Sequence, residues 1–142
     1  MNSEICLNSL WKIYGGSADS AIKQLQSGLD PLDLYQRTGL RAAVRDVSLE
    51  IQTGEIFVVM GLSGSGKSPP LRLLNGLVRP CLGEVRIQVR QLSSQSPMEL
   101  NTLRRAQMVM VIQSFALIPH RTVNDNAAFG LVVAGVPSPE RR

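Results

Sequence analysis

One eight-residue segment, GLSGSGKS at residues 61–68, combines glycines, hydroxyls and a lysine in the pattern G-x-x-x-x-G-K-[ST]. Glycines allow a backbone to fold tightly and turn successive N–H groups toward an anion, and a helix that follows adds its positive dipole end. A lysine at position 67 supplies a charge for terminal phosphates, and a hydroxyl at position 68 supplies a ligand for Mg²⁺. The segment therefore predicts a nucleotide-phosphate site, with these binding residues: Gly61, Ser63, Gly64, Ser65, Gly66, Lys67 and Ser68.

The surroundings of this loop favour the phosphate-binding interpretation. A continuous apolar run, Ile56–Met60, precedes it and is typical of a strand covered on both faces. A helical pattern follows from Lys67, with Leu71, Leu74 and Val78 on one face. A chance match in a chain of this length has a frequency of roughly half a per cent. The alternative is a glycine-rich turn with a solvated lysine.

The elements upstream of the loop suggest a strand followed by a small helical insertion. Ile5–Tyr14 reads as an edge strand, and Ser17–Leu29 has the apolar spacing of a short helix. Asp30 can cap a second helix, which has a proline in its first turn and a stop at Gly39. Residues 15–40 are therefore expected to form a helical insertion, and alternation at residues 47–51 predicts a strand that turns at residues 53–54.

Downstream of the loop, strand and helix signals continue to alternate. Alternation at residues 85, 87 and 89 predicts a strand, and Met108–Ile112 predicts a second buried one. Ser96 and Glu99 form a capping box for a helix through Arg105. Thr122–Ala134 reads as a helix closed by a glycine, and Ser-Pro at residues 138–139 signals a further helix just before the end, which predicts a sequence cut short.

Composition narrows the classes of partner. The chain has 142 residues, a net charge of +4 and 15 basic residues, but its longest basic run is a pair, which argues against a nucleic-acid interface. Its two cysteines match no metal-ligand spacing and read as reduced thiols of a cytosolic protein. No signal peptide is visible at the start, and the longest apolar stretch, Ala127–Val136, is shorter than the roughly 20 residues of a membrane span. No direct membrane insertion is expected.

Taken together, the motifs resemble those of an ATP-binding cassette (ABC) transporter ATPase. The resemblance rests on GLSGSGKS followed by VIQSFALIPHRTVNDNAAFGL, and it covers the chain from about residue 5 to the end. LWKIYGG, QLQSGLDPLDLYQRTGL and VRDVSLEIQTGEIFVVMGLSGSGKS are similar to the glycine betaine/proline uptake branch. The resemblance implies the N-terminal part of an α/β P-loop NTPase. It would contain an antiparallel β layer, the start of a parallel core and, at residues 123–142, the start of a helical subdomain.

The resemblance also implies roles for residues outside the loop. Tyr14 would stack on adenine, although a strand-end aromatic packed on the core is the alternative. Gln113 would open the glutamine loop at residues 113–123, ligate Mg²⁺ with Ser68, and lie near a membrane subunit. His120 would be a loop residue rather than a catalytic histidine. The implied cofactors are ATP and Mg²⁺. The implied partners are a membrane-spanning permease and a second ATPase subunit, on the cytoplasmic face of the cell membrane.

Three family features needed for hydrolysis have no counterpart in this sequence. None of the 11 acidic residues follows an apolar run of four, so no strand ends in the carboxylates that hold Mg²⁺ and orient water. No LSGGQ-like signature is present, and the family's switch histidine would lie further downstream. The chain alone is therefore expected not to hydrolyse ATP, and exposed core strands would leave it marginally stable or prone to aggregate.

Three functions remain open after the sequence analysis. The first is an importer ATPase subunit for betaine-like solutes, represented here by part of its length. The second is a non-catalytic module that binds a nucleotide or a partner protein. The third is an inactive product of a decayed gene.

Two positions depart from the family pattern. Pro69-Pro70 follows Ser68, where the family usually has threonine, and Pro69 has no N–H to give the α-phosphate. Because proline also disfavours helical geometry in the preceding residue, Ser68 would be disturbed, although proline is tolerable in a first helical turn. Binding should weaken by about 1–3 kcal/mol. Gln88-Val89 stands where the family often has Asp-Gly, a better hairpin turn.

Overall fold

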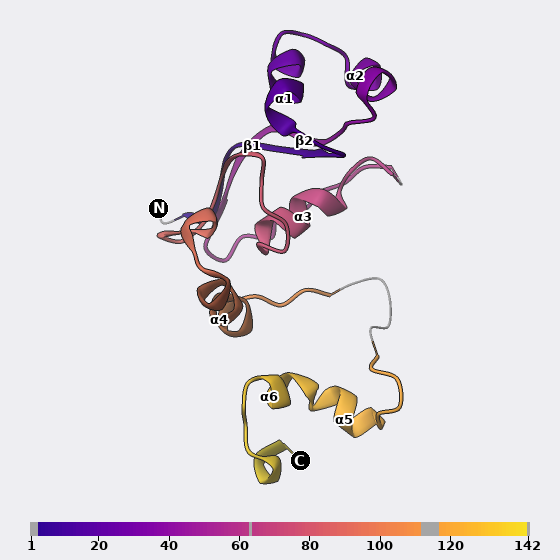
Figure 1. Cartoon of the computed structure of the whole chain (residues 1–142). Coiled ribbons are helices and arrows are strands. Elements are labelled where there is room, and N and C mark those ends of the chain that lie inside the picture. The colour runs from indigo at the N-terminus through magenta and orange to yellow at the C-terminus, as the bar shows by residue number, and fades with distance from the viewer. Residues whose placement is uncertain (1–2, 63, 112–116, 142) are drawn as a thin grey trace. The chain divides into compact units, whose positions relative to one another are not determined.

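The computed structural model describes residues 3–62, 64–111 and 117–141 (Figure 1). The chain divides into two compact units, Met1–Leu100 and Asn101–Arg142, and each is described by itself. Among the described residues, no helix has both the length and the apolar character needed to cross a membrane.

The first unit is built on a four-stranded antiparallel sheet with the strand order β2-β1-β3-β4. The strands are β1 (Ser3–Tyr14), β2 (Arg41–Gln52), β3 (Leu82–Ile87) and β4 (Arg90–Gln91). The expected α/β class, with an antiparallel β layer, is confirmed. Strand β1 lies between β2 and β3, so the predicted edge strand is an inner one.

Two short helices connect β1 to β2, the first as the apolar spacing predicted and the second as its capping residues predicted. Helix α1 spans Ala18–Gln26 and helix α2 spans Pro31–Thr38. The carboxylate of Asp30 accepts a hydrogen bond from the N–H of Leu32 at 2.7 Å. Gly39 ends α2 in the left-handed conformation, and its N–H donates to the carbonyl of Tyr35.

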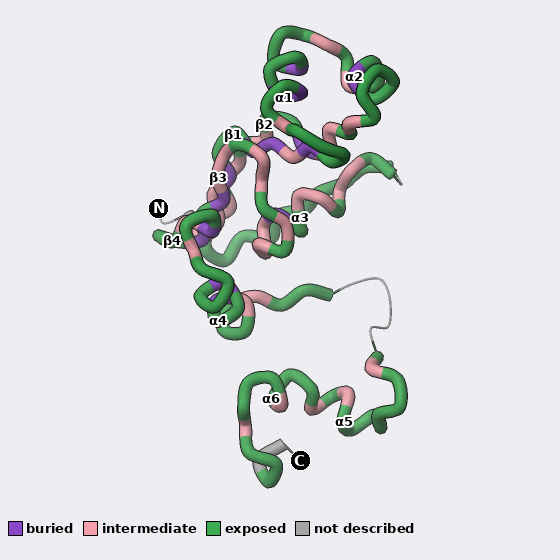
Figure 2. The backbone as a smooth tube through the Cα atoms, viewed as in Figure 1, coloured by how far each residue is buried: buried purple, intermediate pink, exposed green. Residues whose placement is uncertain are grey.

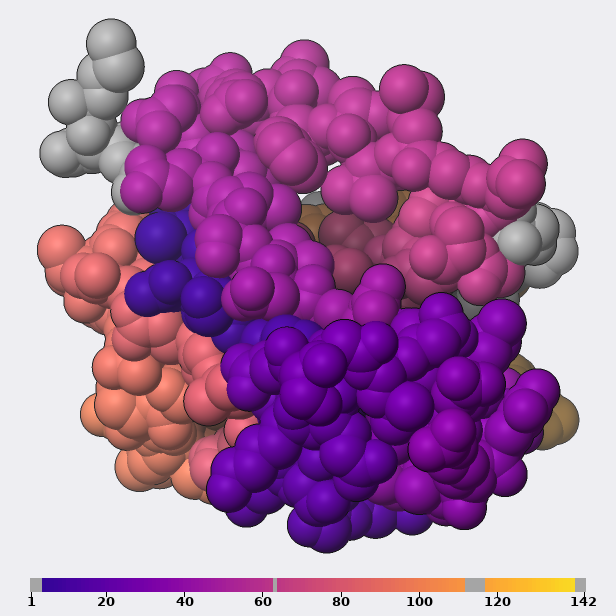
Figure 3. Space-filling view, turned by 90° about the horizontal axis from the view of Figure 1, so that it is seen from above, coloured from indigo at the N-terminus to yellow at the C-terminus, as the bar shows by residue number. Residues whose placement is uncertain are grey.

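These helices cover one face of β1 with apolar side chains. Alternate residues of the strand, Trp11 and Ile13, point into the cluster and are 5% and 3% exposed. Each fully buried side chain of this size contributes about 1.5–3 kcal/mol to stability. Figure 2 shows the buried positions gathered on the inner sides of α1, α2 and the sheet, and Figure 3 shows the insertion as a compact violet mass. The cluster consists of Trp11, Ile13, Ala21, Ile22, Leu25 and Leu34.

Helix α3 spans Ser68–Leu74 and follows the glycine-rich loop directly, as expected. Its buried side chain is Leu73, which is 1% exposed, whereas Leu71 is 47% exposed. The predicted apolar face was therefore wrong, and the helix ends before Val78. A helix this short can be held by the burial of one leucine, so it does not need the longer apolar face that the sequence pattern predicted.

Within the described residues, neither of the two predicted buried strands forms a strand. Residues 56–60 adopt no regular structure, and their exposed fractions range from 43% for Phe57 to 89% for Ile56. Met108–Val111 is likewise irregular and largely exposed, and Ile112 lies outside the described residues. A strand of a parallel core is stabilised only between flanking strands and beneath covering helices. The described sheet supplies neither, so these apolar runs remain at the surface.

A two-residue turn joins β3 to β4. Arg86 pairs with Gln91 and Ile87 with Arg90, so Gln88 and Val89 form the loop of the hairpin. Gln88 takes a left-handed φ of 51°, and Val89 is 89% exposed. Placing Val89 in the strand was therefore wrong. The alternation ends at the hairpin turn, which lies where the family pattern has Asp-Gly. A 3₁₀ turn, η1 (Leu92–Ser94), follows.

The capping box of helix α4 (Pro97–Gln107) is present as predicted. The Ser96 N–H donates to Oε2 of Glu99 at 2.8 Å, and the Glu99 N–H donates to the Ser96 hydroxyl at 3.3 Å. The backbone bond from Ser96, with a smaller contribution from its side chain, lowers the pKa of Glu99 below its ordinary value.

In the second unit, the predicted helix Thr122–Ala134 is divided at Ala128. Helix α5 spans Val123–Ala127, helix α6 spans Phe129–Val133, and the 3₁₀ turn η2 spans Ser138–Arg141. The Thr122 hydroxyl caps α5 by accepting from the N–H of Asp125 at 3.1 Å, and Gly135 follows α6 with a positive φ, as expected.

Gly83 allows a close approach of β3 to a bulge in β1, and this leads to a first prediction. A Cβ on Gly83, which has φ +82°, would overlap the carbonyl oxygens of Asn8 and Ser9. Gly83→Ala should therefore lower the free energy of unfolding by more than the backbone strain alone, measured by thermal and urea denaturation followed by circular dichroism. Gly28→Ala is the control, since Gly28 has φ +99° but open space around it. It should lose only about 1–2 kcal/mol, and equal losses would contradict the close approach.

The capping box gives a second prediction, on pH. Because the folded pKa of Glu99 is lowered, its carboxylate stabilises α4 above the unfolded pKa of about 4.3, and this contribution is lost as the pH falls through the folded value. NMR titration of the carboxyl carbon should show the low pKa. Ser96→Ala should raise that pKa only in part, since the main-chain N–H remains. If the pKa of Glu99 in this variant were unchanged or fully normal, the Ser96 N–H could not be the larger of the two causes and the Ser96 hydroxyl the smaller.

Candidate nucleotide-binding site

The glycine-rich loop adopts a conformation that its glycines make accessible. Gly64 and Gly66 take φ values of 79° and 88°, in the left-handed region where a side chain would be strained. The Ser65 N–H donates to the carbonyl of Leu62 at 3.1 Å and closes a turn between them. Ser63, one of the predicted binding residues, lies outside the described residues. Alternating backbone conformations of this kind form a concave row of N–H groups suited to an anion.

The half-buried Lys67 folds back over this loop. Its ammonium group donates to the carbonyl oxygens of Gly61, at 2.7 Å, and of Leu62, and to the Ser65 hydroxyl at 3.3 Å. The three donors of the ammonium therefore all meet loop oxygens. A Cβ on Gly61 would lie 2.6 Å from the Ser65 hydroxyl, so a larger residue there would force the serine side chain to turn away. Lys67 is thus held where an anion cradled by the loop would meet its charge.

The sheet brings this loop to the strand end that carries Tyr14. A Cβ on Gly66 would lie 3.6 Å from the carbonyl oxygen of Ala43, so the loop lies against β2 at that point. The neighbours of Ala43 in β2 pair with the end of β1, where Ile13 faces Ala42 and Tyr14 faces Arg41. The predicted base-binding and phosphate-binding residues of the first unit therefore gather at one end of the β1–β2 ribbon.

Tyr14 presents its ring at the surface at this end. The side chain is 38% exposed and is not part of the buried cluster that receives Trp11 and Ile13. The Lys12 ammonium lies 5.2 Å from the centroid of the Tyr14 ring. This exposure favours the stacking role over the alternative of a core aromatic.

The two prolines occupy the first turn of α3 without breaking it. Ser68, the residue that directly precedes Pro69, is already the first residue of the helix, and the N-cap residue Lys67 has φ and ψ of −63° and −33°. The expected disturbance of Ser68 by Pro69 is thus absent from the fold, as the tolerance of first-turn prolines allows. The chemical consequence remains, because positions 69 and 70 have no N–H. Donors for an anion would therefore have to come from residues 64–68, because the prolines in the first turn of the helix offer none.

Two further predicted residues lie elsewhere in the chain. Gln113 lies outside the described residues. His120 is exposed in a loop of the second unit, with a left-handed φ of 64°, as a loop residue would be. Asn126 ties that loop down, because its Oδ1 accepts from the Ile118 N–H at 2.7 Å and its Nδ2 donates to the Thr122 carbonyl at 3.0 Å.

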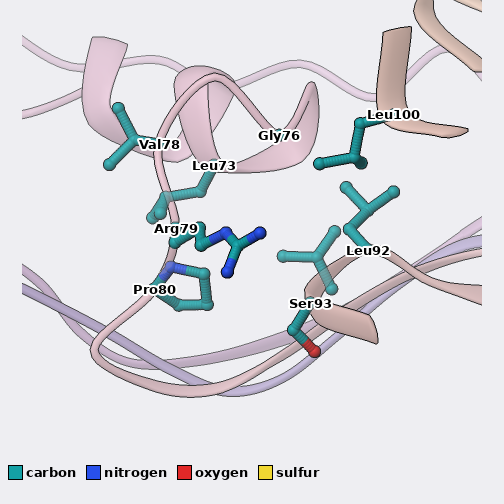
Figure 4. Close-up of a pocket in the computed structure, with 9 residues that line it drawn as sticks. Leu73, Gly76, Val78, Arg79, Pro80, Leu92, Ser93 and Leu100 are labelled. Atoms are coloured by element: carbon teal, nitrogen blue, oxygen red, sulfur yellow. The ribbon is translucent and has the colours of Figure 1, made fainter. Parts of the chain in front are cut away.

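A small apolar hollow lies behind helix α3 (Figure 4). The side chains of Leu73 from α3, Leu92 from η1 and Leu100 from α4 line it, together with Arg79. With one charged group and mainly apolar walls, the hollow offers little polar chemistry to a ligand. Its lining shows instead how Leu73 holds α3 against the sheet and so fixes the position of the loop.

The sequence analysis missed one residue at the strand end, Lys12. Its ammonium donates to the carbonyl oxygen of Arg79 at 2.8 Å as well as lying over the Tyr14 ring. A lysine two residues before an aromatic on one strand shares a face with it, and this spacing could have pointed to the pair.

A comparison with known protein families identifies the family to which this chain belongs. Residues 44–141 match the family described as ABC transporter, and since this span is most of the chain, the protein belongs to that family.

Particular relatives lie in the glycine betaine branch, which confirms the resemblance seen in the sequence. The glycine betaine/proline betaine transport system ATP-binding protein ProV of Escherichia coli is 48% identical over 136 residues, covering 96% of this chain and 34% of ProV. The glycine betaine/carnitine transport ATP-binding protein GbuA of Listeria monocytogenes is 42% identical over 98% of this chain and 35% of its own length. This chain thus spans about a third of these relatives.

A solved structure supports the same fold. A dimeric, post-hydrolysis state of the ATP-binding cassette MJ0796, bound to ADP and Pi, has a TM-score of 0.72 and 28% identity to this chain. The alignment covers 96% of this chain and 52% of that cassette. The observed α/β arrangement is therefore that of about half of an ABC cassette.

Proposed function

We propose that this chain binds Mg-ATP as part of the ATP-binding subunit of an importer for glycine betaine-like solutes. The observation that carries the proposal is the glycine-rich loop, with Gly64 and Gly66 left-handed and Lys67 drawn across it, at the strand end that presents Tyr14. The names of the relatives support the class of solute, because ProV and GbuA are glycine betaine transport proteins.

Each group in the site has a separate part in binding. The N–H groups of residues 61–68 hold the phosphate chain, with Lys67 meeting the terminal phosphates and Tyr14 stacking on adenine. The Ser68 hydroxyl, which is exposed, would hold Mg²⁺ together with Gln113. When bound, Mg²⁺ supplies charge that stabilises the phosphate oxygens. The adenine platform and the phosphate loop come from separate segments of the sequence, so the β1–β2 pairing is needed to join them.

We further propose that this chain binds without turning over ATP by itself. Hydrolysis needs a carboxylate that holds Mg²⁺ and a group that orients water, and no acidic residue of this sequence follows a strand-like apolar run. In the whole protein, the missing carboxylate and water-orienting group would complete the catalytic site. A second ATPase subunit and a membrane-spanning permease would then form the transporter with it at the inner face of the cell membrane. Residues 113–123 would then contact the permease, and residues 123–142 would begin the helical subdomain.

A second candidate function rests on the exposed apolar run at residues 56–60. A surface of this kind is suited to contact another polypeptide, so the chain could act as a partner-binding module without catalysis. An inactive product would instead show neither nucleotide binding nor a cooperative unfolding transition. Calorimetry with Mg-ATP and denaturation of the same sample separate the three cases.

The proposal predicts a weak site that one substitution strengthens. Pro69→Thr restores a backbone N–H next to Ser68, so its affinity for Mg-ATP should exceed that of the native chain by about 5- to 150-fold, equivalent to about 1–3 kcal/mol. Isothermal titration calorimetry of both proteins measures the difference.

Two controls make this result specific. Lys67→Met in the Pro69→Thr background should abolish Mg-ATP binding, because it removes the ammonium that meets the phosphates. Pro31→Thr, which changes the first-turn proline of α2 away from the site, should leave the affinity unchanged. A Pro69→Thr protein that is folded by circular dichroism and binds no Mg-ATP would contradict the assignment of the loop.

A further inference from the structure

Lys12 lies between the Tyr14 ring and the segment that follows helix α3. Its Nζ is 5.2 Å from the centroid of the ring and 2.8 Å from the carbonyl oxygen of Arg79, to which it donates. Lys12 and Tyr14 share a face of β1, whereas Trp11 and Ile13 on the other face point into the buried cluster. The ammonium therefore bridges an exposed aromatic and a main-chain acceptor from a distant part of the sequence.

The segment that accepts from Lys12 is itself fixed to β1. The Cys81 N–H donates to the carbonyl of Trp11 at 2.8 Å, and the Ile13 N–H donates to the Cys81 sulfur at 3.5 Å. Arg79 is two residues away from these bonds, so its carbonyl is held close to the strand. The acceptor that anchors the Lys12 ammonium thus belongs to an ordered connection.

The same connection continues back into helix α3. The Val78 N–H donates to the carbonyl of Arg72 at 3.1 Å, and the Gly76 N–H donates to the carbonyl of Leu73 at 3.0 Å. Leu73 is the buried anchor of the helix that begins at the phosphate loop. Lys12 therefore ties the aromatic of the strand end to the helix that carries the loop.

We propose that Lys12 is a positioning residue that holds the Tyr14 ring in place for an adenine base. The proposal rests on the nucleotide site proposed above and adds a residue to its base-binding part. A cation over an aromatic face attracts the ring, and an immobilised ring loses less conformational freedom when a base stacks on it. The ammonium lies over one face of the ring of Tyr14, which is 38% exposed, and the base is assigned to the opposite face. Lys12 itself contacts neither base nor phosphate in this role.

The test compares ATP with pyrophosphate, which carries phosphate contacts but no base. Lys12→Met keeps most of the apolar stem and removes the ammonium. It should lower the affinity for Mg-ATP by about two- to fivefold, the usual size of an exposed cation–aromatic interaction, and leave the affinity for pyrophosphate unchanged. Calorimetry of the native chain and of Pro69→Thr measures both ligands. In a Tyr14→Leu background, Lys12→Met should have no further effect on ATP.

A second readout needs no ligand. The chain has two tyrosines, Tyr14 and Tyr35, so selective labelling of tyrosine rings gives two sets of NMR signals. Lys12→Met should move the signals of Tyr14 and leave those of Tyr35 in place, while Lys12→Arg should restore both the signals and the ATP affinity. Lys23→Met, a lysine of α1 away from the ring, should change neither signals nor affinity.

Several outcomes would overturn the positioning role. An equal loss of ATP and pyrophosphate affinity would show that Lys12 supports the fold as a whole. Unmoved Tyr14 signals, or a loss of ATP affinity that persists in the Tyr14→Leu background, would show that the ammonium does not act through the ring. If neither Mg-ATP nor pyrophosphate binds detectably to the native chain or to Pro69→Thr, the proposed nucleotide site is refuted instead. The NMR signals of the Tyr14 ring would still decide whether Lys12 holds Tyr14.

Discussion

Strand β1 pairs on one side with β2 and on the other with β3, and the remaining features of the first unit depend on this double pairing. One face of the strand sends Trp11 and Ile13 beneath α1 and α2. Its other face carries Lys12 and Tyr14. Because β2 meets the loop at Ala43 while β3 continues from the segment after α3, the strand holds both ends of the loop-helix unit. The candidate site is therefore a consequence of where β1 ends.

Local sequence signals predicted the parts of the fold that depend on neighbours along the chain. Asp30 caps the start of α2 and Gly39 ends it, and the Ser96–Glu99 hydrogen bonds cap the start of α4. Each of these contacts joins residues only a few positions apart, so the local sequence is enough to predict it. The glycine-rich loop was predictable for the same reason. The turn at Gln88-Val89 shows the limit of this reasoning, since alternation continued to Val89 while the chain had already turned.

Features that depend on distant segments were the ones that sequence reasoning missed. Residues 56–60 carry the apolar pattern of a covered strand, but the pattern records only a tendency to be buried, and burial requires flanking strands and helices. The contact of Lys12 with Arg79 joins residues 67 positions apart, so no local window contains it. Gln113 took its predicted role from the family pattern alone, and a glutamine after an apolar run carries no such signal by itself.

The prolines after Ser68 separate the requirements of the fold from those of the site. The first N–H groups of a helix have no partner within it, so replacing two of them leaves α3 intact, as its helical start at Ser68 shows. The same groups are the donors that an anion would use in the proposed site, so we expect the change to affect binding and not the fold. In the proposed site, phosphate binding would then depend on the left-handed glycines and on Lys67. A larger part of the discrimination between nucleotides and bare phosphates would then fall to the proposed stacking on Tyr14, and so to the contacts that hold its ring.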